Sequence, residues 1–314
     1  MTFDPYALMQ SAVDIVQQSE HPTNKVAASL AGKDAGGRAF SIARTNYWPE
    51  DIKKKLGMET RIGSSSGTIH AETACLLQSP LTNGAALFVT DVPCPNCVKN
   101  MAEAGIKAMY IDHKGFAKDF ALRRGGHFDN MALRICEKAG ISIFKIYRKD
   151  KRTEDILKIP EGFSPVIEKP ARIVPLHEKI GEDMFLKIVT REQQIYKTHP
   201  FAIAIAASAL GAHFIISAEA HPCPGYTAQT VEKGDEKYST ILQPVNRVMM
   251  MAARYGLKIE PEFFFASRVP TARELVDLVG AKLTRIQIGD VTKARDNDGL
   301  TAFAQLKNAG ILEA

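Results

Sequence analysis

The two halves of the sequence carry the same landmarks in the same order. A His-Pro pair followed by a segment of small residues occurs at His21-Pro22 and again at His199-Pro200. A strand-like segment that ends in Val-Pro follows in each half, at 87–93 and at 264–270. Ordered self-similarity of this kind is the signature of a repeated structural unit. We therefore predict that one fold occurs twice in the chain.

The connection between the two copies is polar and irregular. Residues 148–152 are all charged, and prolines recur between Pro160 and Pro175. Such composition is typical of a linker. We predict a first domain at residues 1–150, a linker at 151–185 and a second domain at 186–314.

Within each copy, short strand patterns alternate with helical patterns. In the first copy, strands are expected at 85–90 and 107–112, with a helix at about 94–104 between them. In the second copy, the corresponding helix is expected at 272–279. This alternation predicts an α/β fold in which helices cover a sheet.

The most apolar run of the chain, residues 201–218, is near the lower length limit for a membrane span. We interpret it as two buried strands joined by a turn at 210–212, because its ends are rich in strand-forming residues. The five cysteines include one C-x-x-C pair, and the N-terminus shows no secretory pattern. We therefore expect a cytoplasmic protein without a membrane segment.

The formal net charge of +5 comes from 40 Lys and Arg against 35 Asp and Glu. A mild excess of this size suits an anionic metabolite as well as it suits nucleic acid, so charge alone selects no partner.

One group of residues has the composition of a metal site. Cys94 and Cys97 are three positions apart at a predicted helix start, so both sulfurs can reach one ion. His70, at the start of the preceding helix, can supply a third ligand. Three protein ligands leave the fourth tetrahedral position of Zn²⁺ open, which is typical of a catalytic site.

Glu72 lies two residues after His70 and is not needed as a ligand. A carboxylate at this place can move a proton from an attacking water to a ring nitrogen and a leaving amine. H-x-E followed by P-C-x-x-C is the signature of zinc deaminases. The spacing therefore predicts metal-assisted hydrolytic deamination, with Glu72 as the catalytic residue.

Residues 68–112 resemble the cytidine and deoxycytidylate deaminase superfamily, and the segments 84–90 and 97–107 are most similar to its deoxycytidylate branch. The resemblance extends over about residues 5–150. It implies a three-layer α/β/α sandwich around a five-stranded mixed sheet, here duplicated. It also implies hydrolytic removal of an exocyclic amine and multimeric assembly.

The resemblance assigns roles to individual residues. His70, Cys94 and Cys97 match the zinc ligands, Glu72 matches the proton shuttle, and Asn46 matches a substrate-contacting asparagine. The chain departs from the family where Ala74 replaces a frequent asparagine and where Val26-Ala27-Ala28 replaces V-G-A.

The second copy lacks the metal ligands. Laid on the repeat, residues 70–72 correspond to Leu242-Gln243-Pro244, and the two cysteines correspond to Thr271 and Glu274. We predict that this domain binds no catalytic zinc and pairs with the first domain as an internal partner. A homo-oligomer is the alternative assembly.

Further candidates for substrate contacts lie near the motif. Trp48, with Tyr47, can stack on a base, and Lys25 can hold a phosphate. Ala71 lies between His70 and Glu72. Ser64–Ser66 and the pair Arg123 and Arg124 are weaker candidates for binding an anion.

The function that these residues favour is zinc-dependent deamination of a small cytosine nucleotide, with conversion of dCMP to dUMP as the leading hypothesis. Deamination of a base in tRNA or single-stranded DNA, and deamination of a nucleoside or a purine base, remain open. The non-enzymatic alternative is a regulatory zinc-binding module, although structural zinc sites usually have four protein ligands.

Overall fold

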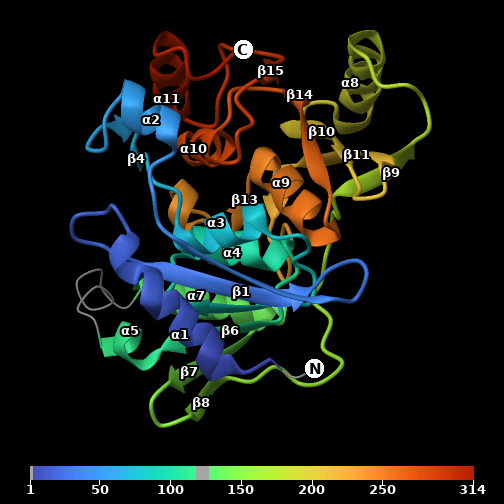
Figure 1. The fold of residues 1–314 in the computed structure, drawn as a ribbon. Coiled ribbons are helices and arrows are strands. Elements are labelled where there is room, and N and C mark those ends of the chain that lie inside the picture. Colours follow the sequence, from blue (N-terminus) through green and yellow to red (C-terminus); the bar gives the residue numbers. More distant parts are fainter. Residues whose placement is uncertain (1–2, 118–126) are drawn as a thin grey trace.

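The computed structural model describes residues 3–117 and 127–314. It contains two large sheets, one in each half of the chain (Figure 1). We call residues 3–157, which include the first sheet, the first unit, and residues 172–314, which include the second sheet, the second unit.

The first unit follows the expected alternation of strands and helices. Its elements are, in chain order, α1 (Pro5–Ile15), η1 (Val16–Gln18), β1 (Ala27–Lys33), β2 (Ala39–Thr45), α2 (Glu50–Lys55), β3 (Arg61–Ile62), β4 (Ser65–Ser66), α3 (Ala71–Gln78), β5 (Ala86–Val89), α4 (Pro95–Glu103), β6 (Ala108–Asp112), α5 (His113–Ala117), α7 (His127–Ala139), β7 (Ser142–Tyr147) and β8 (Arg152–Leu157).

The first sheet is mixed and has six strands in the order β2-β1-β5-β6-β7-β8. β5, β6 and β7 are parallel, whereas β1, β2 and β8 pair antiparallel with their neighbours. The sheet therefore has one strand more than the expected five, namely β8, whose residues lie in the predicted linker. All but its last residue are exposed, and charged side chains are usual on such an edge strand.

Helices cover both faces of this sheet. Alternate residues of β5 point to opposite sides, as the pleat requires. Phe88 packs beside Met9 of α1, whereas Leu87 and Val89 belong to the core beneath α3 and α4. The result is the expected three-layer α/β/α sandwich, in which α3 and α4 lie on one face of the sheet and α1 lies on the other.

The second unit contains a second α/β arrangement. Its elements are β9 (Arg172–Leu176), α8 (Glu182–Tyr196), β10 (Phe201–Ala207), β11 (His213–Glu219), β12 (His221–Pro222), η2 (Glu236–Tyr238), β13 (Ile241–Leu242), α9 (Pro244–Tyr255), β14 (Lys258–Ala266), α10 (Ala272–Gly280), β15 (Gln287–Ile288) and α11 (Asn297–Asn308).

The apolar run at 201–218 forms β10 and β11, as expected, with the turn between them. None of the helices among the described residues has the length and apolar character that crossing a membrane requires.

The two sheets share a topology. In the first, β1 lies between β2 and β5 and is antiparallel to both, and β5 is parallel to β6. In the second, β10 lies between β11 and β14 and is antiparallel to both, and β14 is parallel to β15. The helices also enter in the same order, α1, α3 and α4 in one unit and α8, α9 and α10 in the other.

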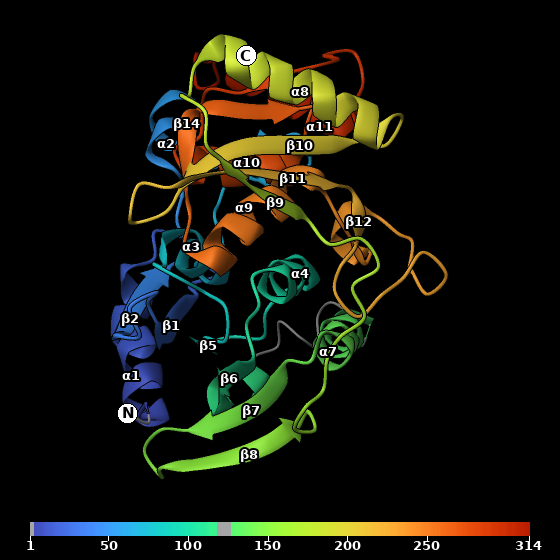
Figure 2. The same ribbon diagram turned by 90° about the vertical axis from the view of Figure 1, so that its right-hand side faces the viewer.

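The units pack against each other through their helices. α9 lies against both α3 and α4 (Figure 2). One continuous apolar core extends through both units. At the centre of this interface, buried Arg247 of α9 donates to Glu103 of α4 at 3.0 Å, and also to the carbonyl oxygens of Glu219 and Lys169. A core shared in this way indicates that the two units are stabilised together.

The predicted linker, residues 151–185, is not a continuous irregular connection, because it contributes a strand to each sheet. Its first part forms β8 in the first sheet, and its later part forms β9, which pairs with β11 at the edge of the second sheet. Only residues 158–171 lie between the two sheets.

Candidate metal centre

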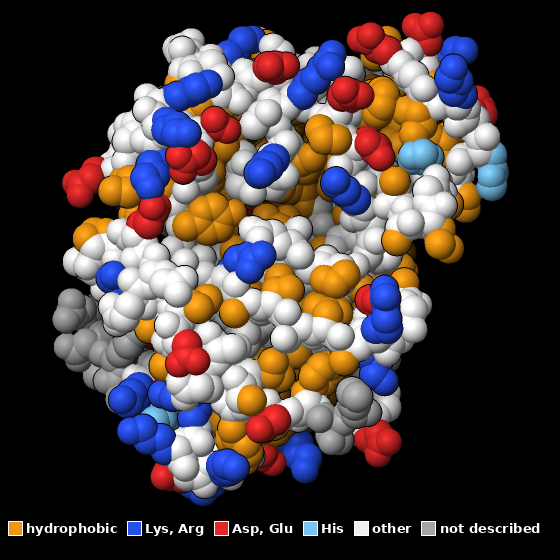
Figure 3. Space-filling model, viewed as in Figure 1, with side chains coloured by type: hydrophobic (Ala, Val, Ile, Leu, Met, Phe, Trp, Pro, Cys, Tyr) orange, Lys and Arg blue, Asp and Glu red, His pale blue; other side chains and the backbone are white. Residues whose placement is uncertain are grey.

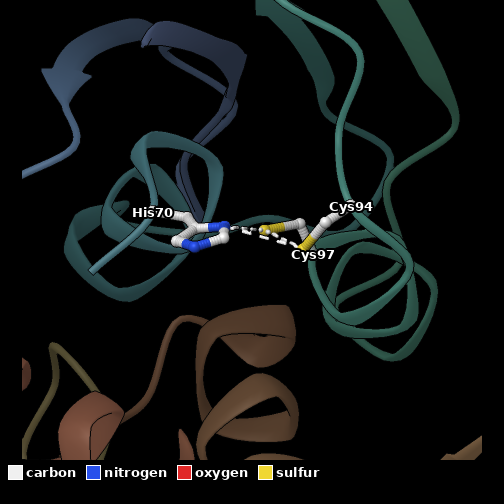
Figure 4. Close-up of side chains that lie close together, drawn as sticks. All are labelled: His70, Cys94 and Cys97. Atoms are coloured by element: carbon white, nitrogen blue, oxygen red, sulfur yellow. Dashed lines mark hydrogen bonds between the residues drawn. The ribbon is translucent and has the colours of Figure 1, made fainter. Parts of the chain in front are cut away.

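Three side chains converge where α3 and α4 begin. His70 is the N-cap residue of α3, and Cys94 is the N-cap residue of α4, whose first residue is Pro95. Proline at the first helical position is favoured because its missing N–H has no partner there in any case. Cys97 lies three residues after Cys94, so both sulfurs are on one side of the first turn and point toward the imidazole (Figure 4).

The separations of the donor atoms fit a tetrahedral zinc ion. The two sulfurs are 3.6 Å apart, and His70 Nδ1 lies 3.6 Å from Cys94 Sγ and 3.2 Å from Cys97 Sγ. Zinc distances of about 2.3 Å to sulfur and about 2.0 Å to nitrogen place such ligand atoms roughly 3.5–3.8 Å apart. Among the described residues, this is the group of at least three His, Cys, Asp or Glu side chains whose donor atoms come close enough to hold one metal ion.

The two cysteines are electrostatically linked. The hydrogen bond between the two cysteine side chains lowers the pKa of Cys94 well below its ordinary value and raises the pKa of Cys97. Both side chains are buried. A buried thiolate beside a second thiol and an imidazole is a donor set that a cation stabilises.

Glu72 lies on the first turn of α3, two residues after the candidate metal ligand His70. Only 3% of its surface is exposed, and burial raises the pKa of its carboxyl. It lines the same cavity as His70, Cys94 and Cys97. A carboxyl of this kind, beside the candidate metal ligands, can both accept and return a proton.

The cavity has a volume of about 1310 Å³ and lies between the two units. The contribution of the first unit includes the metal ligands, Glu72 and the whole segment 21–26. The second unit contributes residues near η2 and at the starts of α10 and α11, which are Gly234, Asp235, Lys237, Arg273, Asp277, Arg295, Asp296 and Asp298. No local sequence pattern indicates this contribution, because it depends on how the units pack.

Of the four predicted substrate contacts, three line the cavity and one does not. Lys25, Asn46 and Ala71 line the cavity. The amide of Asn46 binds the loop that precedes β1, because its Oδ1 accepts from Val26 N at 2.9 Å and its Nδ2 donates to Asn24 O at 2.9 Å. Lys25 Nζ donates to Gln17 O at 3.1 Å.

Trp48 and Tyr47 do not belong to the cavity wall. Trp48 is 7% exposed, packs in the core, and stacks on His21, which does line the cavity. Tyr47 pairs with Ile69 through their backbones. Of the candidates for binding an anion, Ser64–Ser66 line the cavity, and Arg123 and Arg124 lie outside the described residues.

The starts of α9 and α10 in the second unit correspond to those of α3 and α4 but carry different residues. The N-cap of α9 is Gln243, so by helix position Gln243 corresponds to His70, one residue later than the sequence alignment placed it. Thr271 and Glu274 occupy the positions of Cys94 and Cys97 on α10. None of these three residues reproduces the His-Cys-Cys donor set.

Glu274 joins the two helix starts by hydrogen bonds. Its buried carboxylate accepts from the backbone N–H of Val245 at 2.8 Å and from that of Thr271 at 2.9 Å. It thus caps α9 and its own helix α10, where it forms a capping box with Thr271. In the first unit, the metal ligands come from the corresponding pair of helix starts.

We expect Glu274→Ala to destabilise the protein by about 3 kcal/mol, because it leaves buried N–H groups of two helices without an acceptor. In a unit of this size, that loss lowers the unfolding midpoint by about 6–12 °C. Calorimetry with metal analysis tests this, with the exposed Glu262→Ala as matched control. An unchanged midpoint would contradict the capping role of Glu274.

Comparison with known proteins supports the zinc site. Residues 4–113 match the family model described as the cytidine and deoxycytidylate deaminase zinc-binding region. The chain is 32% identical over 83 residues to ComE operon protein 2 of Bacillus subtilis (strain 168), and 31% identical over 91 residues to the deoxycytidylate deaminase of Enterobacteria phage T4. These matches cover 25% and 28% of this chain, and only 38% and 42% of the two relatives.

Two further similarities cover more of the compared protein. An uncharacterized deaminase of the luxG 3′ region of Aliivibrio fischeri is 26% identical over 126 residues, which are 40% of this chain and 81% of that protein. The crystal structure of a dCMP deaminase from the cyanophage S-TIM5, in complex with dCMP and dUMP, is 24% identical. Its match covers 45% of this chain and 94% of that chain, with a TM-score of 0.31.

Proposed function

The first unit of this chain belongs to the cytidine and deoxycytidylate deaminase superfamily, and from that premise we propose that the protein is a zinc-dependent hydrolase that deaminates a cytosine nucleotide. The observation that carries the proposal is the spacing of His70 Nδ1 and the two cysteine sulfurs, together with buried Glu72 on the wall of the same cavity. The substrate that we favour is dCMP, which would be converted to dUMP and ammonia.

The roles of the residues follow from their positions. His70, Cys94 and Cys97 would hold Zn²⁺, which in three-ligand sites supplies a Lewis acid with an open position for water. Glu72 takes a proton from the attacking water and delivers it to N3 of the pyrimidine ring. A second proton passes through the same carboxyl to the exocyclic amine. The C4–O bond forms, the C4–N bond breaks, and ammonia leaves.

Two observations favour a small nucleotide over a nucleic acid. Tyr47 and Trp48, which would stack on flanking bases, do not line the cavity. On the face shown in Figure 3, Lys and Arg side chains are interspersed with Asp and Glu, whereas a strand-binding surface is expected to carry a continuous basic stripe. A regulatory zinc module is disfavoured because the described residues offer three ligands around the site, not four.

We further propose that the second unit is a copy of the same domain that has lost its metal ligands and now serves as an internal partner. Its shared topology and its contribution to the cavity wall support this. All five cysteines are free and buried, which is compatible with a reducing compartment such as the cytoplasm.

An ammonia-release screen of the zinc-loaded 314-residue chain tests the proposed substrate. We expect dCMP to have a higher kcat/KM than CMP, cytidine, adenosine, guanine or a single-stranded oligonucleotide. Faster release from the oligonucleotide, with a steep dependence on salt, would instead assign the protein to nucleic-acid deamination. No release from any of these compounds by the zinc-loaded protein would contradict the proposed function.

A further inference from the structure

The segment that leads into His70 is contacted from two sides, by the first unit and by the second unit. Residues 65–69 comprise β4, the second strand of the short β3–β4 hairpin, and the connection from it to α3. On one edge, Tyr47 of the first unit holds Ile69, because Tyr47 N donates to Ile69 O at 3.1 Å and Ile69 N donates to Tyr47 O at 2.8 Å. His70 is the ligand that comes from α3, whereas both cysteines come from α4, so this segment determines where the imidazole lies relative to the thiols.

Helix α10 of the second unit lies along this segment. At its start, Arg273 Nη1 donates to Thr68 O at 2.6 Å, and Arg273 Nη2 donates to Ser66 O at 3.0 Å. At its end, Gly280 contacts Ile69 so closely that an added Cβ would lie 2.5 Å from the Ile69 side chain. The second unit thus contacts this segment at both ends of α10.

Arg273 suits this role for a chemical reason. Its guanidinium is a rigid planar fork, so two carbonyl acceptors that bind it are fixed relative to each other. The side chain is 13% exposed, and it lines the cavity beside the metal ligands. Removing it would leave the carbonyl of buried Thr68 without this donor, at a partly buried place.

We propose that Arg273 is a positioning residue for the metal ligand His70, so that the unit without a metal site sets the coordination geometry in the unit that has one. The inference rests on the proposed function only through the zinc ligands and not through the identity of the substrate.

The arrangement is reciprocal. Buried Lys99 of α4 donates to Ser239 O at 2.8 Å and to Ile241 O at 3.2 Å, in the segment that leads into α9. Each unit therefore holds the segment before the corresponding helix of the other, as expected for the self-complementary interface of a twofold pair. Only the segment held by Arg273 continues into a metal ligand.

The test uses the 314-residue chain loaded with Co²⁺ or Zn²⁺. Arg273→Ala is expected to bind metal about 10–100-fold more weakly than the unchanged protein and so to release it faster to a chelator; this is the range of affinity loss found for partners that orient metal ligands. The visible absorption of the cobalt form is expected to change, because the imidazole no longer has one fixed position. Arg273→Lys keeps the charge but not the fork, and is expected to restore part of both properties.

Arg254→Ala is the matched control, because Arg254 also donates across the interface, to Glu103 O at 3.4 Å, but has no contact with the segment before His70. It is expected to leave metal release and the cobalt spectrum unchanged. Equal effects of the two alanine variants, or a folded Arg273→Ala protein with unchanged release and spectrum, would overturn the proposal. If Arg273→Ala does not fold, the lysine variant decides, since unchanged metal release in that variant would have the same consequence. Metal release and the cobalt spectrum are both measured without substrate. They therefore test the role of Arg273 even if the protein does not deaminate dCMP.

Discussion

Replacing Glu72 with glutamine is expected to reduce turnover by a factor of about 10²–10⁴ while zinc remains bound. The amide keeps the size of the side chain but cannot accept a proton from water and pass it on. Because Glu72 is not one of the three converging donors, the metal content should stay at its original value. Product formation measured together with zinc per chain by elemental analysis checks both parts.

Two further variants make this result specific. Glu59→Gln changes an exposed glutamate of the same unit and should retain full turnover. Cys94→Ala removes a ligand and should lose zinc and turnover together. Full activity in the Glu72→Gln protein would refute the proton-shuttle role, and undiminished zinc in the Cys94→Ala protein would refute the ligand assignment.

The metal centre was predictable because its determinants are local. His70, Cys94 and Cys97 each lie at a helix start, and the spacing of a helical turn already places two of them together. The strands at 201–207 and 213–219 were predictable for the same reason, since strand-forming residues and a glycine turn specify a hairpin within one short segment.

Contacts between segments far apart in the chain could not be predicted in this way, because no local sequence pattern specifies them. Thr271 and Glu274 have the sequence of a capping box, so a helix start could be inferred there. The additional bond from Val245 N to Glu274 depends on the approach of α9 to α10. The contact of Arg273 with Thr68 depends on the packing of one unit against the other, which the sequence pattern does not specify.

Two predictions differ from the structure, the linker at 152–157 and the substrate contact by Trp48. In both cases the same residue types suit more than one structural environment. The charged segment 152–157 has the polarity of a linker, but the same polarity suits an exposed edge strand. Trp48 follows the predicted substrate contact Asn46, yet its ring packs against the backbone near Gly67, where an added Cβ would lie 3.3 Å from the indole. The absence of a side chain at Gly67 is what gives Trp48 room in the core.

Separating the two units is expected to abolish activity. A chain that ends at residue 160 retains all of the first sheet, the three metal ligands and Glu72. It would nevertheless expose the helical face of α3 and α4 that packs on α9, and it would leave buried Glu103 without Arg247. Removing one partner of a buried ion pair alone costs about 3–5 kcal/mol, which is a large part of the stability of a domain.

We therefore expect residues 1–160, expressed alone, to aggregate and to show no turnover. Co-expression with residues 161–314 should restore a soluble, zinc-containing complex, because the cut lies between β8 and β9 and interrupts neither sheet. Gel filtration, zinc analysis and ammonia release measure these outcomes. A soluble, fully active monomer of residues 1–160 would show that the second unit is dispensable, and both its role as an internal partner and the positioning role of Arg273 would then be wrong.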